Sequence, residues 1–207
     1  MKNKKRFPLI DAPESASTSN RGSALVIVVL VLAFLQVIGL VLLTVTATGP
    51  QVAGNIRAQQ QASNIAETGF DVAWTQIEEL LGNGGWVNFE GHYLTQPDGI
   101  DLPQQDNYFR KLTDAELLDL IDPDGDGQPD IATVLYFRQT FIQKKDGSPD
   151  ERFTYTVFLI DDEAGGGTSD PEDAILVCIG TVGRGTNMSS SRVEAELVIQ
   201  LPGGGSH

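Results

Sequence analysis

The hydrophobic pattern of this chain changes once, near residue 50, between two long helical segments. From Ser23 to Leu43 the residues are apolar on every face, with no charge and with Gln36 as the only strongly polar side chain. About 20 helical residues span roughly 30 Å, the thickness of the hydrocarbon core of a bilayer. A core helix of a globular domain would instead carry polar residues along one face. The pattern therefore predicts a membrane-spanning helix over residues 23–49.

The second helical segment, residues 50–83, is amphipathic. Gly49-Pro50 precedes it, and because proline lacks an amide donor, this pair predicts an interruption of the helix. Apolar residues then recur at three- and four-residue steps, which predicts one buried stripe whose small side chains allow close packing. The Gly-rich residues 82–85 end the segment. The stripe consists of Ala62, Ala66, Gly69, Ala73, Ile77 and Leu81, with Phe70 and Trp74 widening it.

The pattern of residues 84–207 predicts one exported domain that contains a short helix and a sheet. Thr113 and Glu116 form a capping box for a helix that ends near Ile121. Short turns at residues 145–147 and 184–187 favour an antiparallel meander, and the amphipathic helix is the expected cover for its apolar face. The fold class is therefore α+β, a long N-terminal helix packed on an antiparallel sheet of about four strands. The expected strands are Ile131–Gln143, Arg152–Ile160, Ala174–Gly183 and Arg192–Leu201.

Charge is distributed unevenly about the apolar segment. The formal net charge is −14, and it divides into +3 before Ser23 and −17 after Ser23. The positive-inside rule predicts a single-pass membrane protein, with residues 1–22 in the cytoplasm and the acidic domain exported. Such an acidic domain repels phosphate, so nucleic acid is excluded as a partner. Cys178 is the only cysteine and lies in an apolar segment, which predicts a buried, inert thiol and no intramolecular disulfide.

Two kinds of N-terminal processing fit this arrangement. Residues 1–22 form a polar, basic leader that meets the apolar segment directly at Gly22-Ser23. Val45-Thr46-Ala47 also fits a small-residue site at which a secretory signal would be removed whole. The apolar segment is long for a secretory signal, and the helical pattern continues beyond it, so a retained helix is favoured.

The N-terminal third of the chain resembles the type IV prepilins, and most closely the PilX family of minor pilins. The segment VAGNIRAQQQA at residues 52–62 is similar to the AGN-hydrophobe-R segment of that family, with its QQA continuation. The segment IAETGF at residues 65–70 resembles the AEAGL-type sequence that follows in the family. Residues 180–183, ahead of Ser191-Arg192-Val193, are similar to the final hairpin of many pilin-like proteins. The resemblance covers roughly residues 20–75, and the sheet region matches only loosely.

This resemblance implies a fold and a function. Prepilin peptidase would cut after Gly22 and leave Ser23 as the mature N-terminus. The apolar helix would hold the subunit in the bacterial inner membrane and then pack among other minor and major pilins in a filament at the cell surface. Ile27 stands at the fifth mature position, where major pilins usually have glutamate. The absence of this glutamate is typical of some minor pilins that lie at filament tips. An adhesin at the tip is a further expected partner.

A motif in the exported domain predicts a calcium site. Over residues 122–133 the chain places carboxylates at loop positions one, three, five and nine, glycine at six and a backbone carbonyl at seven, as in an EF-hand loop. Thr133 replaces the usual glutamate at position twelve, so Asp161, Asp162 or Glu163 is the expected substitute. A solvated acidic turn is the alternative interpretation. The candidate ligands of Ca²⁺ are Asp122, Asp124, Asp126, Gln128 and Asp130.

No catalytic motif accompanies this loop, and we expect no enzymatic activity. His92 and His207 are the only histidines, too few for a catalytic zinc cluster. Three functions are therefore open: a minor pilin for assembly or initiation of a type IV pilus, a minor pseudopilin of a type II secretion system, and a membrane-tethered calcium-binding or hydrolytic domain unrelated to filaments.

Overall fold

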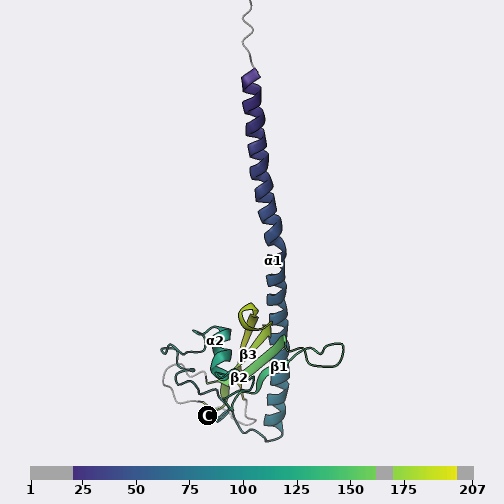
Figure 1. Cartoon of the computed structure of the whole chain (residues 1–207). Coiled ribbons are helices and arrows are strands. Elements are labelled where there is room, and N and C mark those ends of the chain that lie inside the picture. The colour runs from purple at the N-terminus through teal and green to yellow at the C-terminus, as the bar shows by residue number, and fades with distance from the viewer. Residues whose placement is uncertain (1–20, 162–169, 200–207) are drawn as a thin grey trace, which may run out of the picture. The chain divides into compact units, whose positions relative to one another are not determined.

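The computed structural model describes residues 21–161 and 170–199, which form two compact units divided between Gln51 and Val52. The leader residues 1–20 lie outside the described residues. Helix α1, Arg21–Gly82, supplies the first unit and begins the second, and the sheet with its remaining cover completes the second unit. The layout is the predicted one, a long N-terminal helix packed on a four-stranded antiparallel sheet (Figure 1).

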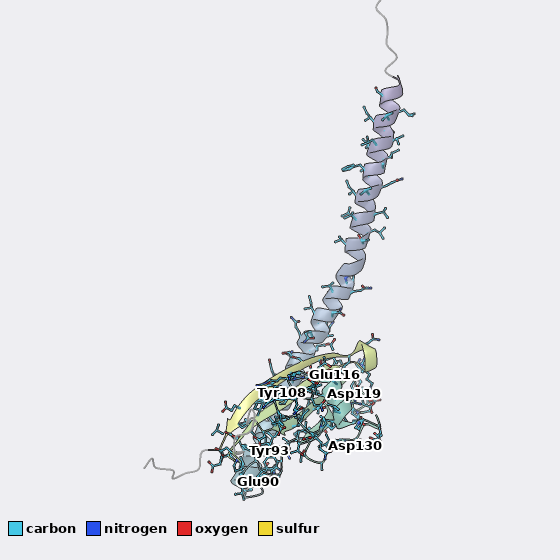
Figure 2. The ribbon with its side chains drawn as sticks, turned by 90° about the vertical axis from the view of Figure 1, so that its left-hand side faces the viewer. Glu90, Tyr93, Tyr108, Glu116, Asp119 and Asp130 are labelled. Atoms are coloured by element: carbon cyan, nitrogen blue, oxygen red, sulfur yellow. The ribbon has the colours of Figure 1, made fainter. Side chains whose placement is uncertain are left out.

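The first part of α1 exposes its apolar side chains on every face (Figure 2). Large hydrophobic residues from Leu25 to Val45 are between 46% and 70% exposed. The polar groups here are satisfied within the helix, since the Thr44 hydroxyl donates to the Val41 carbonyl at 2.8 Å and the Thr46 hydroxyl to the Leu42 carbonyl at 2.6 Å. This part of α1 is long and apolar enough to cross a membrane.

The predicted interruption at Gly49-Pro50 is wrong, because α1 is helical from Arg21 to Gly82 with Pro50 inside it. Proline removes only one backbone donor, the one that would reach the carbonyl four residues earlier. The many hydrogen bonds on either side keep the helical geometry, as in other membrane helices that contain proline.

The sheet has the order β1-β2-β3-β4, and each strand runs antiparallel to its neighbour. All four predicted strands are present, with shifted ends. The first is the most shortened, because a turn in which the Val134 amide donates to the Ile131 carbonyl precedes it. The predicted turns are confirmed at Lys144–Ser148, whose backbones are hydrogen-bonded, and at the 3-10 helix η1. The elements are β1 Tyr136–Thr140, β2 Phe153–Ile160, β3 Asp173–Val182, η1 Gly185–Asn187 and β4 Ser189–Val198.

The second part of α1 packs its small residues directly against β2 and β3. A Cβ atom added to Gly180 of β3 would lie 2.2 Å from the Ala62 carbonyl oxygen and 2.5 Å from the Ala66 nitrogen. A Cβ on Gly69 would meet the Tyr155 ring at 2.7 Å. The buried stripe is thus confirmed, and its small side chains allow backbone to approach backbone.

Trp74 is an exception to the predicted stripe. Its side chain is 38% exposed rather than buried against the sheet. Phe70 and Leu81 pack against the buried cluster between α1 and the sheet, whereas Trp74 is not among the residues that do so. Cys178 lies on β3 opposite Gly69, and its predicted burial is confirmed. Burial raises the pKa of its thiol to about 12.

The opposite face of the sheet is also covered, by a second layer that the hydrophobic pattern did not predict. Helix α2, Asp114–Ile121, and the irregular chain before it bury Leu94, Ile100 and Phe109 against β2 and β3. Arg192 links β4 to this layer, because its guanidinium donates to Asp114 and to the carbonyls of Phe109 and Leu112 at 2.8–3.0 Å. β2 and β3 are consequently buried on both faces, as their continuous apolar sequences would indicate.

Candidate metal centre

The acidic loop follows the C-terminal end of α2, and backbone hydrogen bonds hold both of its ends against that helix. The capping box is formed as predicted, with the Thr113 hydroxyl accepting from the Glu116 amide and Glu116 accepting from the Thr113 amide. Asp122 ends the helix, its amide donating to the Leu118 carbonyl at 3.1 Å. The Asp130 amide donates to the Ile121 carbonyl at 2.8 Å, which closes the base of the loop.

Within this loop, three carboxylates converge. One oxygen each from Asp122, Asp124 and Asp126 lies within 4.8 Å of the others. Gly125 and Gly127 have φ of +72° and +87°, left-handed values that favour glycine and let the chain turn twice in a short span. Three of the predicted ligands therefore lie close together, at alternating positions of a tight turn.

Each of these carboxylates uses one oxygen to hold the loop backbone. The amide of Gly127 donates to Asp122 Oδ2 at 3.2 Å, and the amide of Asp126 donates to Asp124 Oδ1 at 3.1 Å. The amide of Gln128 donates to Asp126 Oδ1 at 2.7 Å. Because one oxygen of each residue is fixed in this way, the loop presents the carboxylates as a set rather than as three independent side chains.

Asp122 differs from the other two in its burial. Its side chain is 0% exposed, whereas Asp124 and Asp126 are exposed. Its Oδ1 is buried without a hydrogen-bond partner in the part of the chain that the structure describes. An unsatisfied buried acceptor typically costs about 1–3 kcal/mol, and more where the group is charged.

Arg138 provides the charge that partly compensates Asp122. Its guanidinium nitrogen lies 3.5 Å from Asp122 Oδ2. Arg138 occupies an irregular position in β1, where the register with β2 shifts, and has φ of +43°, a left-handed value uncommon for a residue with a side chain. Its amide is held by the Thr156 hydroxyl at 3.1 Å. This irregularity directs the side chain of Arg138 toward the loop. The sequence contains no pattern that predicts this backbone conformation.

The other predicted ligands lie around this triad. Asp130 is exposed and is not among the three converging carboxylates, but the pKa of its carboxyl is raised by loss of hydration and then by the charges of Asp124, Asp126 and Asp122. Gln128 offers its backbone carbonyl at position seven. Thr133, at position twelve, has a buried hydroxyl oxygen without a hydrogen-bond partner among the described residues.

The expected substitutes for position twelve are only partly described. Asp161 directly follows the end of β2, and it is not part of the converging triad. Asp162 and Glu163 lie outside the described residues, as does His207. The other histidine, His92, stacks on Trp86 with ring centroids 3.9 Å apart, and burial lowers the pKa of its imidazole.

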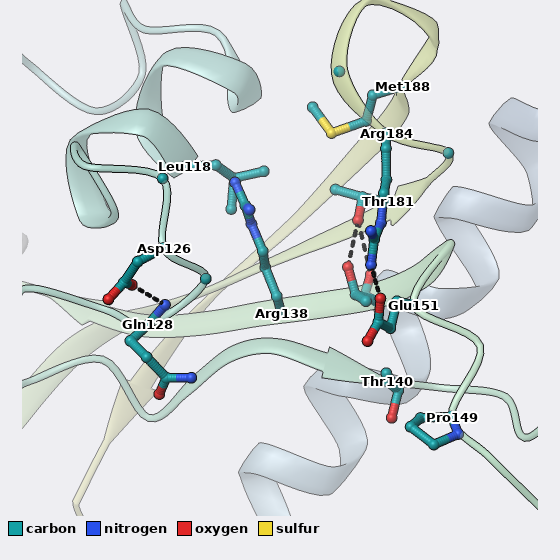
Figure 3. A pocket seen from close by; sticks show the side chains of 15 residues that line it. Leu118, Asp126, Gln128, Arg138, Thr140, Pro149, Glu151, Thr181, Arg184 and Met188 are labelled. Atoms are coloured by element: carbon teal, nitrogen blue, oxygen red, sulfur yellow. Dashed lines mark hydrogen bonds and ion pairs between the residues drawn. The ribbon is translucent and has the colours of Figure 1, made fainter.

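A pocket of about 580 Å³ adjoins the loop (Figure 3). Residues 125–128 of the loop form one wall, and Leu118 and Met188 add apolar surface. Arg138 extends into the space between them, and Arg184, paired with Glu151, lines the far side (Figure 3). The loop and its arginine are therefore shared between the carboxylate triad and this pocket.

The predicted processing site lies near the N-terminus. The Gly22-Ser23 bond falls in the first turn of α1, which begins at Arg21. Comparison of the chain with protein-family models, curated proteins and solved structures gives no match.

Proposed function

We propose that this chain is a minor pilin, a single-pass inner-membrane protein whose periplasmic head enters a type IV pilus and takes part in initiating its assembly, at the filament tip. The observation that carries the proposal is the contrast along α1. Its first part exposes large apolar side chains on every face, and its second part buries small residues against an antiparallel sheet. A pilin needs both, because the same helix serves as membrane anchor, filament core and head scaffold.

The exposed part of α1 favours an apolar environment. Removing apolar surface from water stabilises by roughly 25 cal/mol per Å², so side chains exposed over this length favour lipid or other helices strongly. Without charges, association with neighbouring helices depends on close packing. Ser23, Ala24, Ala33 and Gly39 offer the small surfaces for it, and a Cβ on Gly39 would meet no atom of this chain within 4 Å.

The residue at the fifth mature position, Ile27, is consistent with a subunit at the filament tip. The side chain at the fifth mature position is apolar and 61% exposed, so it offers no carboxylate to an adjacent subunit. A tip subunit has no subunit above it and does not need that group. The partners that follow are prepilin peptidase, other minor and major pilins, the inner membrane and a tip adhesin, with no role for nucleic acid.

Two other functions remain to be tested against this one. A minor pseudopilin of a type II secretion system would share the helix and the processing site. A membrane-tethered ion-binding exported domain would keep its leader uncut, and α1 would then be an anchor only. N-terminal processing separates the third function from the first two, and the phenotype of a deletion strain separates the first two from each other.

The first experiment reads the mature N-terminus by mass spectrometry of the protein isolated from membranes. We expect a chain that begins at Ser23. Gly22→Val should block processing, whereas Ser19→Val, a matched change within the leader, should not. A mature protein that begins at Thr48 or retains Met1 would overturn the pilin proposal.

The second experiment deletes the chain and measures surface filaments and protein secretion separately. We expect fewer filaments and unchanged secretion, with recovery by the full chain but not by residues 51–207 exported alone. Loss of secretion with normal piliation would favour the pseudopilin function. Normal piliation and secretion together would exclude both filament functions.

A further inference from the structure

Asp122 is the residue from which an additional function of the head can be argued. A carboxylate that is fully removed from solvent normally has all its oxygens hydrogen-bonded, because charge without a partner is strongly disfavoured away from water. Here Oδ2 has the Gly127 amide and Arg138, whereas Oδ1 has no partner among the described residues. No group within residues 21–161 or 170–199 supplies that partner, so a bound ligand is the candidate for it.

The surroundings of Asp122 define the charge of that partner. Asp124 and Asp126 bring their own carboxylate oxygens within 4.8 Å of it, and Asp130 adds its negative charge nearby. Among the described residues, Arg138 is the one cation that forms an ion pair with these four carboxylates, through Asp122. A ligand with two positive charges would leave the cluster close to balance, and an anion or a neutral ligand would not.

We propose that this loop binds one calcium ion through Asp122, Asp124 and Asp126, with the Gln128 carbonyl and Asp130 completing the site. The hydrogen bond from Gly127 fixes Oδ2 of Asp122 and leaves the buried Oδ1 as the oxygen that ligates. Asp124 and Asp126 each keep a second oxygen in the same way. This assignment does not depend on the proposed pilin function.

The chemistry of the donors selects calcium among the divalent ions. All the donors are hard oxygens, which excludes the softer metals that prefer nitrogen or sulfur. Calcium accepts six to eight oxygens in irregular geometry, whereas magnesium requires a near-ideal octahedron. Because Thr133 supplies no bidentate carboxylate, water has to complete the coordination shell, which lowers the expected affinity. The expected dissociation constant is on the order of 10⁻⁴ to 10⁻³ M, the range of extracellular calcium modules.

Thermal unfolding of the full chain in detergent, followed by near-ultraviolet circular dichroism, tests the proposal. Calcium at about 100 times its dissociation constant should raise the melting temperature of the head by on the order of 5 °C relative to chelator. Magnesium at the same concentration should raise it by much less, which controls for charge screening. Calorimetric titration should give one calcium ion per chain.

Two pairs of substitutions locate the ion. Asp124→Asn with Asp126→Asn should abolish the calcium-dependent rise, and both residues are exposed, so the head should still fold. Asp98→Asn with Asp106→Asn removes the same charge from exposed positions outside the loop and should leave the rise intact. An unchanged melting temperature with calcium, an equal response to magnesium, or a full response in the Asp124/Asp126 variant would each overturn the proposal.

Discussion

The two parts of α1 place apolar residues in opposite ways. Between Ser23 and Val45 the side chains are large, branched and exposed, and no charge interrupts them. Between Ala62 and Ile77 small side chains alternate with Ile65 and Ile77 on the buried face, and charged residues occupy the outer faces. The comparison shows that apolar surface alone does not identify a core. The first part is long and apolar enough to cross a membrane, and the second has its partner in the sheet.

Charge follows the same division. Between Ser23 and Val45, α1 carries no charge, whereas the head accommodates a fully buried carboxylate, Asp122, by placing Arg138 and a backbone amide beside it. A charge can therefore be buried in the head at a position built for it, but nowhere along the apolar part of α1. Four predictions test whether this division is as sharp as the comparison states.

The largest effect is expected from charges introduced into the apolar part of α1. Leu32→Lys with Leu35→Lys should disfavour membrane insertion by about 3 kcal/mol for each lysine, because neither ammonium finds a partner in hydrocarbon. The matched pair Val72→Lys with Thr75→Lys has the same spacing on exposed positions of the head part and should change head stability by less than about 0.5 kcal/mol per site. Membrane and soluble fractions after alkaline extraction report the outcome. Equal fractionation of the two variants would contradict the membrane assignment.

A smaller effect is expected where α1 meets the sheet. Gly180→Ala should destabilise the head by about 2 kcal/mol, because the new methyl group would overlap the backbone of Ala62 and Ala66. Gly54→Ala is the control, since it lies on α1 with nothing within 4 Å of a new Cβ and should stabilise the helix slightly. Denaturant unfolding of the full chain in detergent measures both. If Gly180→Ala were as stable as Gly54→Ala, the close backbone packing described above would be incorrect.

Much of this packing, and half of the candidate site, could be predicted from sequence because both depend on local periodicity. The three- and four-residue recurrence of small residues identified the buried stripe, and the alternating aspartates with intervening glycines identified the converging carboxylates. Both are short-range patterns that a regular backbone converts directly into position. The predicted burial of Trp74 was wrong, because the helical periodicity does not determine how far across the helix the sheet extends.

The missed features depend on contacts between residues distant in sequence. The second layer over the sheet is built from irregular chain around Phe109, which has no period to recognise. Arg138 reaches Asp122 only because a bulge in β1 turns its backbone to a left-handed conformation. The helix continued through Pro50 because propensity at one residue is weaker than the hydrogen bonding of its many neighbours.

The third prediction concerns the buried charge of the head. Arg138→Gln should destabilise the calcium-free head by about 1 kcal/mol, since a partly exposed arginine 3.5 Å from a buried carboxylate contributes modestly. The same change should increase calcium affinity several-fold, because it removes the positive charge that competes with the ion for Asp122. Arg184→Gln is the control, as it breaks an exposed ion pair with Glu151 on the same pocket and should have little effect on either quantity. Indistinguishable behaviour of the two variants in chelator and in calcium would show that Arg138 does not act on Asp122.

The smallest effect on the head is expected at Pro50, next to the division between the two units. Pro50→Ala supplies an amide that can donate to the Thr46 carbonyl, so it should strengthen α1 locally. Hydrogen exchange of the amides around residue 50, in the full chain in detergent, should slow accordingly. The melting temperature of the head should not change, because Pro50 is exposed and contributes nothing to the apolar core against the sheet. Gly54→Ala, one turn later, provides the comparison for a gain in helix propensity without a new hydrogen bond. A rise in the melting temperature of the head with Pro50→Ala alone would mean that the two parts of α1 unfold together, and the sharp division between them would have to be abandoned.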